Sequence, residues 1–214
     1  IPFLNETSNE VPQILHATLD HFLLLGTDKS LYLVDSEGTK VNSYHGRSSK
    51  SSVNAIQSIG SRVYVGFGKE LEIIERKLDG FESVGLIEIE SRIKDILIDD
   101  FDNTWVATNN SGLSKISALN NVIYSIESSI KDATFCITKK SSNEILIGGD
   151  GFYKELKQDQ KDTHILRQFE FNSIVWDICQ DPIDPNKLWF ATEEGVFVKK
   201  EFKIPNSPLA STKW

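Results

Sequence analysis

The feature that most constrains this chain is a short apolar segment, ending in a small residue, that occurs five times at nearly even spacing. The small residues follow one another at intervals of 40, 41, 41 and 43 positions. They are Gly26, Gly66, Ala107, Gly148 and Ala191. Because self-similarity at a fixed period of about 20 to 50 residues is the signature of repeat architectures, we interpret the chain as five copies of one structural unit.

Each copy contains the pattern of several short β-strands. An alternating apolar run precedes the small residue, and a turn rich in Asp, Asn or Pro separates the two, most clearly at 99–103 and 181–186. A second turn and a third strand follow, and a more polar fourth strand completes most copies. Four short strands in about 40 residues, without sustained helical periodicity, predict an all-β fold, a β-propeller of five four-stranded blades.

The predicted blades are units of one propeller domain that spans the whole chain. They cover residues 12–48, 49–90, 91–131, 132–172 and 173–214. The last unit ends in a proline-rich stretch that does not predict a strand, whereas residues 1–11 precede the first unit. We therefore expect residues 1–11 to supply the outer strand of the last blade and to close the ring. The alternative is that the chain is part of a larger propeller.

Blade order predicts how these strands pack. The second strand is apolar on both faces, as expected of a strand inside a blade with neighbours on both sides. Its Gly or Ala is expected to let adjacent sheets approach closely. Three tryptophans, Trp105, Trp176 and Trp189, are expected in the core. The two cysteines, Cys136 and Cys179, are expected to be small buried hydrophobes rather than a disulfide.

Two units resemble a known repeat family. Residues 93–108 followed by Gly112 and Leu113, and residues 175–196, resemble the two-component-regulator propeller repeat, V-x-x-I-x-x-D-x-x-G-x-L-W-x-[GA]-T-x-x-G-[LV]. Asn103 stands where that family has its turn glycine, and three units lack the Trp. Residues 24–32 are also similar to the citron-homology propeller, and WD-repeat proteins are a further alternative. These resemblances imply a propeller, and the first implies a sensor module of a larger receptor.

Two aspartates are the candidate catalytic residues. Asp95 and Asp177 share one register in their first strands, and His16, Ala55 and Cys136 are expected at the equivalent positions. Because first strands line a propeller channel, Asp95, Asp177 and His16 are candidate binding residues at its rim. Paired carboxylates can act as general acid and base, as in glycosidases, or bind Ca²⁺. The alternative, which we favour, is that each Asp caps a turn or bonds backbone between blades.

Other motifs predict structure rather than chemistry. Asp150, in a glycine-flanked turn, is a further candidate binding residue. The acidic run at 99–103 lacks the twelve-residue spacing and terminal Glu of a calcium loop, so we predict a turn. The four histidines are scattered, and neither a metal site nor a cofactor is predicted.

Charge and hydropathy limit the classes of partner that we expect for this chain. The chain has 23 Lys and Arg against 31 Asp and Glu, a net charge of −8, which disfavours nucleic acid. Its longest apolar runs, such as 22–25, are too short to span a membrane. It opens without Met, so we expect a trimmed N-terminus. We predict a non-catalytic scaffold that binds another protein. The alternatives are a ligand-sensing module that binds a small ligand or sugar, and a channel-centred glycosidase-like enzyme or lectin.

Overall fold

Every regular element of the described chain is a β-strand. The computed structural model describes residues 10–47, 52–118, 123–125, 133–158 and 163–200. The first sheet contains β1 (Pro12–Ala17), β2 (Leu23–Thr27), β3 (Leu31–Val34) and β4 (Lys40–Tyr44). The second contains β5 (Val53–Ile59), β6 (Arg62–Phe67), β7 (Glu70–Lys77) and β8 (Gly80–Glu88). The third contains β9 (Ile93–Ile98), β10 (Thr104–Thr108), β11 (Leu113–Ile116) and β12 (Ile123–Ser125).

The fourth sheet is continuous over the last two sequence units. It contains β13 (Thr134–Ser141), β14 (Glu144–Gln158), β15 (Thr163–Gln180), β16 (Lys187–Thr192) and β17 (Gly195–Lys200). β14 pairs with β13 up to Gly149 and with β15 from Asp150 onward, and β15 changes partner to β16 at Val175. The predicted five separate blades are therefore four antiparallel sheets, because β14 and β15 each pass through two pairings without a break.

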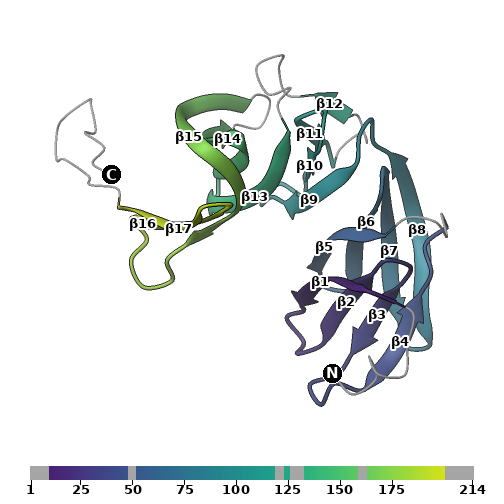
Figure 1. Ribbon diagram of the computed structural model, residues 1–214. Coiled ribbons are helices and arrows are strands. Elements are labelled where there is room, and N and C mark those ends of the chain that lie inside the picture. The colour runs from purple at the N-terminus through teal and green to yellow at the C-terminus, as the bar shows by residue number, and fades with distance from the viewer. Residues whose placement is uncertain (1–9, 48–51, 119–122, 126–132, 159–162, 201–214) are drawn as a thin grey trace.

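The sheets follow one another along an arc that does not close into a ring (Figure 1). The first strands lie next to one another in series, β1 beside β5, β5 beside β9, and β9 beside β13. The predicted closed ring is therefore wrong for the described residues. The segment expected to close it, 1–11, lies outside the described residues up to position 9. A unit denotes the strands around one small residue, and the units are numbered one to five in chain order.

The hydrophobic core lies between neighbouring units. One cluster joins residues of units one and two, and the next three clusters join units two and three, three and four, and four and five in the same way. Their central members are Leu24 and Leu31 with Val53 and Ile56; Ala55 and Leu71 with Ile93 and Ile96; Trp105 and Leu113 with Ile137 and Ile147; and Cys136 and Leu146 with Val175 and Ile178. Units two, three and four therefore bury one face against the preceding unit and the other against the following one.

The small residues allow this close packing, as the sequence predicts. A Cβ atom on Gly26 would lie 2.4 Å from Cγ1 of Val53, and one on Gly148 would lie 2.6 Å from Cγ1 of Val175. Gly66 has the same relation to the first strand of unit three. Since real Cβ atoms do not approach other atoms so closely, a larger residue at these positions would force the sheets apart.

The acidic run of unit three forms a turn, as predicted. The Asp99 carboxylate accepts hydrogen bonds from the backbone N–H groups of Phe101 and Asn103, at 2.8 and 3.0 Å. The residue with positive φ is Asp102, at 59°, so the glycine position of the repeat pattern corresponds to Asp102 and not to Asn103. Aspartate tolerates this left-handed conformation better than most residues, which explains the missing glycine.

Two of the expected core residues are exposed. Trp105 is fully buried and Cys136 is buried, as predicted, and Trp189 is partly buried. Trp176 is 45% exposed, and Cys179 is exposed. Both lie on the first strand of unit five, the last unit that the structure describes.

Candidate functional site

The first strand of every unit carries the same β-bulge. In each unit the strand skips one residue in its pairing with the second strand, just before the position opposite the small residue. The five skipped residues, which we name the bulge row, are Gln13, Asn54, Lys94, Phe135 and Trp176. A bulge redirects a side chain, and bulges are common beside functional sites. None of these five side chains is fully buried.

Three members of the bulge row contact one another across two unit boundaries. The Lys94 Nζ lies 5.5 Å from the centroid of the Phe135 ring. That ring lies 5.0 Å from the Trp176 ring, at an interplanar angle of 55°. Both distances are in the range of favourable cation–π and aromatic contacts. Burial, followed by the nearby charge of Arg92, lowers the pKa of Lys94 from its usual value.

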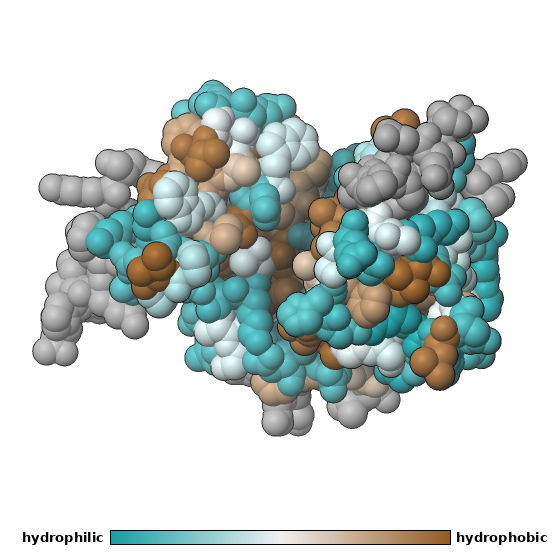
Figure 2. Space-filling model, turned by 90° about the horizontal axis from the view of Figure 1, so that it is seen from below, coloured by the Kyte–Doolittle hydropathy of each residue, from teal (hydrophilic) through white to brown (hydrophobic). Residues whose placement is uncertain are grey.

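The other side of the row is polar. Arg92 Nη2 donates hydrogen bonds to Asn54 Oδ1 at 2.8 Å and to Ser52 Oγ at 2.9 Å. Because the guanidinium needs an acceptor, this contact fixes which way the Asn54 amide points. The Nδ2 of Asn54 is then buried without a hydrogen-bond partner. The row and the adjoining Arg92 therefore combine an aromatic pair, two cations and one unsatisfied amide donor on the inner side of the arc. Seen from below, this side is a hollow with hydrophobic side chains on its wall (Figure 2).

The two candidate catalytic aspartates do share one register. Asp95 pairs with Ala107, and Asp177 pairs with Ala191. The Asp95 carboxylate accepts the backbone N–H of Ile96 and, from the next unit, that of Ile137, each at 2.8 Å. Both of its oxygens are therefore engaged by the backbone, which is the role that we favoured from sequence over acid–base catalysis.

Electrostatics at this pair follow from burial. Burial raises the pKa of Asp95 to about 7; the two backbone hydrogen bonds oppose this rise and the charge of Asp177 adds to it. Burial also raises the pKa of Asp177, against a single backbone hydrogen bond from Ile178 at 2.8 Å. In both groups, the loss of hydration disfavours the charged form.

His16 does not occupy the position expected for it. The residue opposite the small Gly26 is Ile14, and His16 pairs with Leu24 further along the strand. The expected register is therefore wrong by two residues, a shift that keeps the alternation of faces along the strand. The Nε2 of His16 lies 2.9 Å from Ser58 Oγ in unit two, and burial lowers its pKa.

Asp150 is separate from the bulge row. It lies exposed at the bend of β14, and its backbone N–H donates to the carbonyl oxygen of Ala133 at 3.1 Å. The structure therefore does not bring Asp150 into one site with Asp95 and Asp177.

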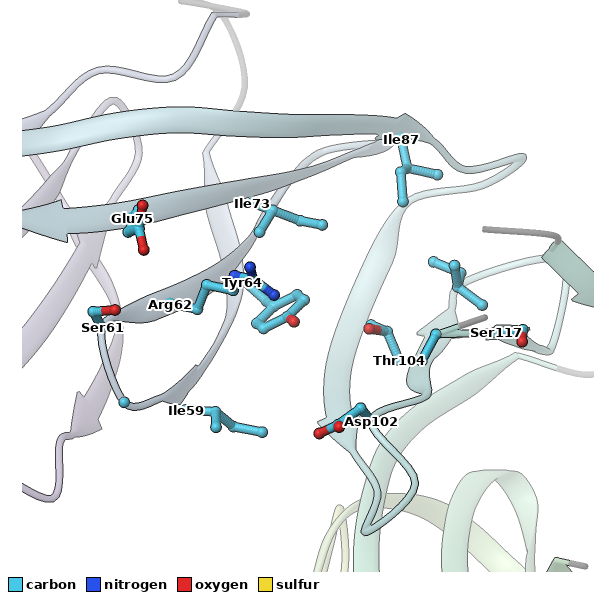
Figure 3. A pocket seen from close by; sticks show the side chains of 13 residues that line it. Ile59, Ser61, Arg62, Tyr64, Ile73, Glu75, Ile87, Asp102, Thr104 and Ser117 are labelled. Atoms are coloured by element: carbon cyan, nitrogen blue, oxygen red, sulfur yellow. The ribbon is translucent and has the colours of Figure 1, made fainter. Parts of the chain in front are cut away.

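One pocket between the second and third sheets was not predicted from the sequence (Figure 3). Its volume is about 600 Å³. Ile59, Tyr64, Ile73 and Ile87 line one side, and Thr104 is among the residues on the other. These five residues come from five different strands, β5, β6, β7, β8 and β10, and only the folding of these strands into two neighbouring sheets brings them together. Neither Asp95, Asp177 nor the bulge row contributes to its lining.

Two searches of the described residues were negative. Within the ranges that the structure describes, no group of three or more His, Cys, Asp or Glu side chains could hold a metal ion. No helix capable of crossing a membrane was found among those same residues.

The comparisons with known proteins identify a fold and no family. No family model matches the chain, and no curated protein matches it. Among solved structures, a chain of the mitotic checkpoint complex has a TM-score of 0.77 at 12% identity, over 94% of this chain and 67% of its own. The β-propeller domain of Cps50 (Swd1) from Myceliophteria thermophila has a TM-score of 0.73 at 11% identity, over 94% of this chain and 70% of its own.

A designed protein is also similar in structure to this chain. The computationally designed Ika8 protein has a TM-score of 0.69 at 15% identity, over 87% of this chain, and this chain spans only 57% of its length. At these identities the similarity establishes the β-propeller type of fold and nothing about activity.

Proposed function

We propose that this chain is a non-catalytic β-propeller scaffold that binds another protein through the bulge row. The observation that supports this proposal is the set of contacting side chains formed by Lys94, Phe135 and Trp176 on three successive first strands. Trp176 is 45% exposed although it packs against Phe135. Large exposed aromatic side chains, held by well-packed neighbours, are the residues that most often dominate protein interfaces.

The row is also preorganised. Each of its side chains projects from a bulge in a paired strand, so little conformational entropy is lost when a partner binds. The partner that fits is a protein segment with an apolar side chain for the Trp176 and Phe135 rings. A neighbouring acidic group on that segment would complement Lys94 and Arg92. One chain with this fold belongs to the mitotic checkpoint complex, an assembly of several proteins, and this analogy is at the level of the fold only.

The hydrogen bonds of Asp95 support a scaffold more than an enzyme. A general acid or base must present a free oxygen to a substrate. Both oxygens of Asp95 accept backbone N–H groups, and one of these comes from the next unit. Asp95 therefore serves to join units three and four.

A ligand-sensing module is the second candidate, supported by the pocket of about 600 Å³ between the second and third sheets. Its volume lies in the range of small-molecule sites. Isoleucine and tyrosine side chains share its lining with Arg62, Glu75 and Asp102, which suits a ligand that has both apolar and charged groups. A ligand-dependent rise in melting temperature that is lost in Tyr64→Ala would favour this function.

The scaffold proposal is tested by affinity capture with purified chain. Wild type and Trp176→Ala serve as baits, and Phe101→Ala, which removes a 44% exposed ring at a distant turn, serves as the matched control. A partner is identified by mass spectrometry and its affinity is then measured by calorimetry with both purified proteins. We expect Trp176→Ala to weaken binding at least tenfold and Phe101→Ala to leave it unchanged. Equal binding by all three chains would refute the bulge row as the binding site.

A further inference from the structure

The last unit leaves exposed a face that every preceding unit buries. In units one, two and three, the third-strand residue opposite the small residue is Leu31, Leu71 and Leu113, and each of these is fully buried. The residue at this position in unit five is Val196, opposite Ala191, and it is 69% exposed. Unit five thus has an aliphatic side chain at this position, as the first three units do, but no neighbouring unit covers it within the described residues.

The neighbouring positions show the same difference. Ala191 is partly exposed, whereas the small residues of the other four units are buried. Cys179 is exposed, and Leu97, at the equivalent position of unit three, is buried between units three and four. We name the surface formed by Asp177, Cys179, Ala191 and Val196 the end face.

A hydrogen-bonding group on this face is also only half used. Asp95 joins its unit to the next by accepting the N–H of Ile137. Asp177 has the same register and accepts the N–H of Ile178 in its own strand. By this register, its second oxygen corresponds to the Asp95 oxygen that accepts the N–H of Ile137. The end face thus has the apolar positions and the carboxylate of the joint that the structure shows between units three and four.

The other end of the arc exposes the surface with which a unit packs on the unit before it. Ile56, Ile96, Ile137 and Ile178 each follow the residue opposite a small residue, and each packs on the preceding unit with at most 5% exposure. Their equivalent in unit one is Leu15, which is 55% exposed. Both ends of the arc therefore present surfaces that are buried wherever two units meet.

We propose that the end face is the docking surface for a further β-sheet unit of this same repeat, carried in the same protein by polypeptide outside these 214 residues. The docking unit places a β-branched residue against Ala191, as Val175 does against Gly148. It donates a first-strand N–H to Asp177, as Ile137 does to Asp95.

The lengths of the matched structures favour this occupant over a second copy. The chain spans 67% and 70% of two solved chains with this fold. Since its five units account for that share, the remaining length corresponds to about two units, which is within the range of known propellers. A second copy of the chain would add five units.

The thiol of Cys179 reports directly on this face. The 214-residue chain and the complete encoded polypeptide are treated with a maleimide under native conditions, and modified peptides are identified by mass spectrometry. We expect Cys179 to react at least tenfold more slowly in the complete polypeptide. Buried Cys136 is the internal control and stays unmodified in both.

A variant pair identifies the joint. Val196→Asp in the complete polypeptide is expected to restore the reactivity of Cys179, and Val41→Asp, at a 52% exposed position of the first sheet, is expected not to. Because Val196 is exposed in the 214-residue chain, Val196→Asp should leave the urea midpoint of that chain unchanged, which verifies folding. Equal reactivity of Cys179 in the two polypeptides would overturn the proposal, as would an encoded polypeptide without another unit. Protection of Cys179 in the 214-residue chain that grows with concentration would overturn it in favour of a second copy.

Discussion

The carboxylate of Asp99 accepts a hydrogen bond of 2.7 Å from the indole Nε1 of Trp105, and Asp181 does the same for Trp189 at 2.9 Å. Each aspartate also accepts backbone N–H groups of the turn that follows it. One carboxylate therefore joins the turn to the second strand in both units that contain the tryptophan. This contact gives a physical reason for the Asp and Trp of the regulator-type repeat pattern.

Trp105→Phe should destabilise the protein because it keeps an aromatic ring and removes the N–H donor. Asp99 is buried, and a buried charged acceptor that loses a partner costs about 1–3 kcal/mol. Urea unfolding monitored by circular dichroism measures the change. Trp189→Phe is the matched control with a smaller expected loss, since Trp189 is only partly buried. A larger loss in Trp189→Phe would contradict this account.

Gly148→Ala should destabilise the joint between units four and five. The added Cβ would lie 2.6 Å from Val175 and 2.7 Å from the sulfur of Cys136. Overpacking of this kind costs about 1–3 kcal/mol. Gly85→Ala is the control, because its nearest neighbour would be at 3.4 Å, close to ordinary contact. Thermal unfolding of the two variants measures the difference, and equal melting temperatures would count against tight packing at the joint.

The stability of the protein should depend on pH through Asp95. Its pKa is raised to about 7 in the folded state, whereas the pKa of Asp in an unfolded chain is about 3.9. The folded state therefore binds this proton more tightly, and stability should fall as the pH rises from about 4 to about 7. Asp95→Asn removes the titration and should reduce this fall.

Urea midpoints at pH 5 and pH 8 test this prediction. His16, whose pKa is lowered, contributes a change of opposite sign, but it is present in both proteins and cancels in the comparison. Asp79→Asn changes an exposed carboxylate and is the control. If wild type and Asp95→Asn lost equal stability between the two pH values, Asp95 would not be the titrating group.

Some features of the site could be predicted from the sequence and others could not. The shared register of Asp95 and Asp177 follows from their equivalent places in the alternating runs of their first strands, and strand pairing confirms it. The position predicted for His16 was wrong by two residues, since Ile14 lies opposite Gly26. A shift of two residues keeps the alternation of faces along a strand, so the alternating pattern alone does not exclude it. The ring contact of Phe135 with Trp176 joins residues 41 positions apart in sequence, and no local pattern indicates it.

The sequence by itself determined the repeat, the strand character of each unit and the need for a small residue where sheets approach. These properties depend on residue size, on β-propensity and on alternation within a few positions, so they can be recognised locally. Only the tertiary structure decided that units four and five share one sheet, that the arc stays open and that Trp176 and Cys179 are exposed. Those outcomes depend on which strand edges and faces meet across 40 or more residues, because burial is a property of the neighbour that covers a side chain and not of the side chain alone.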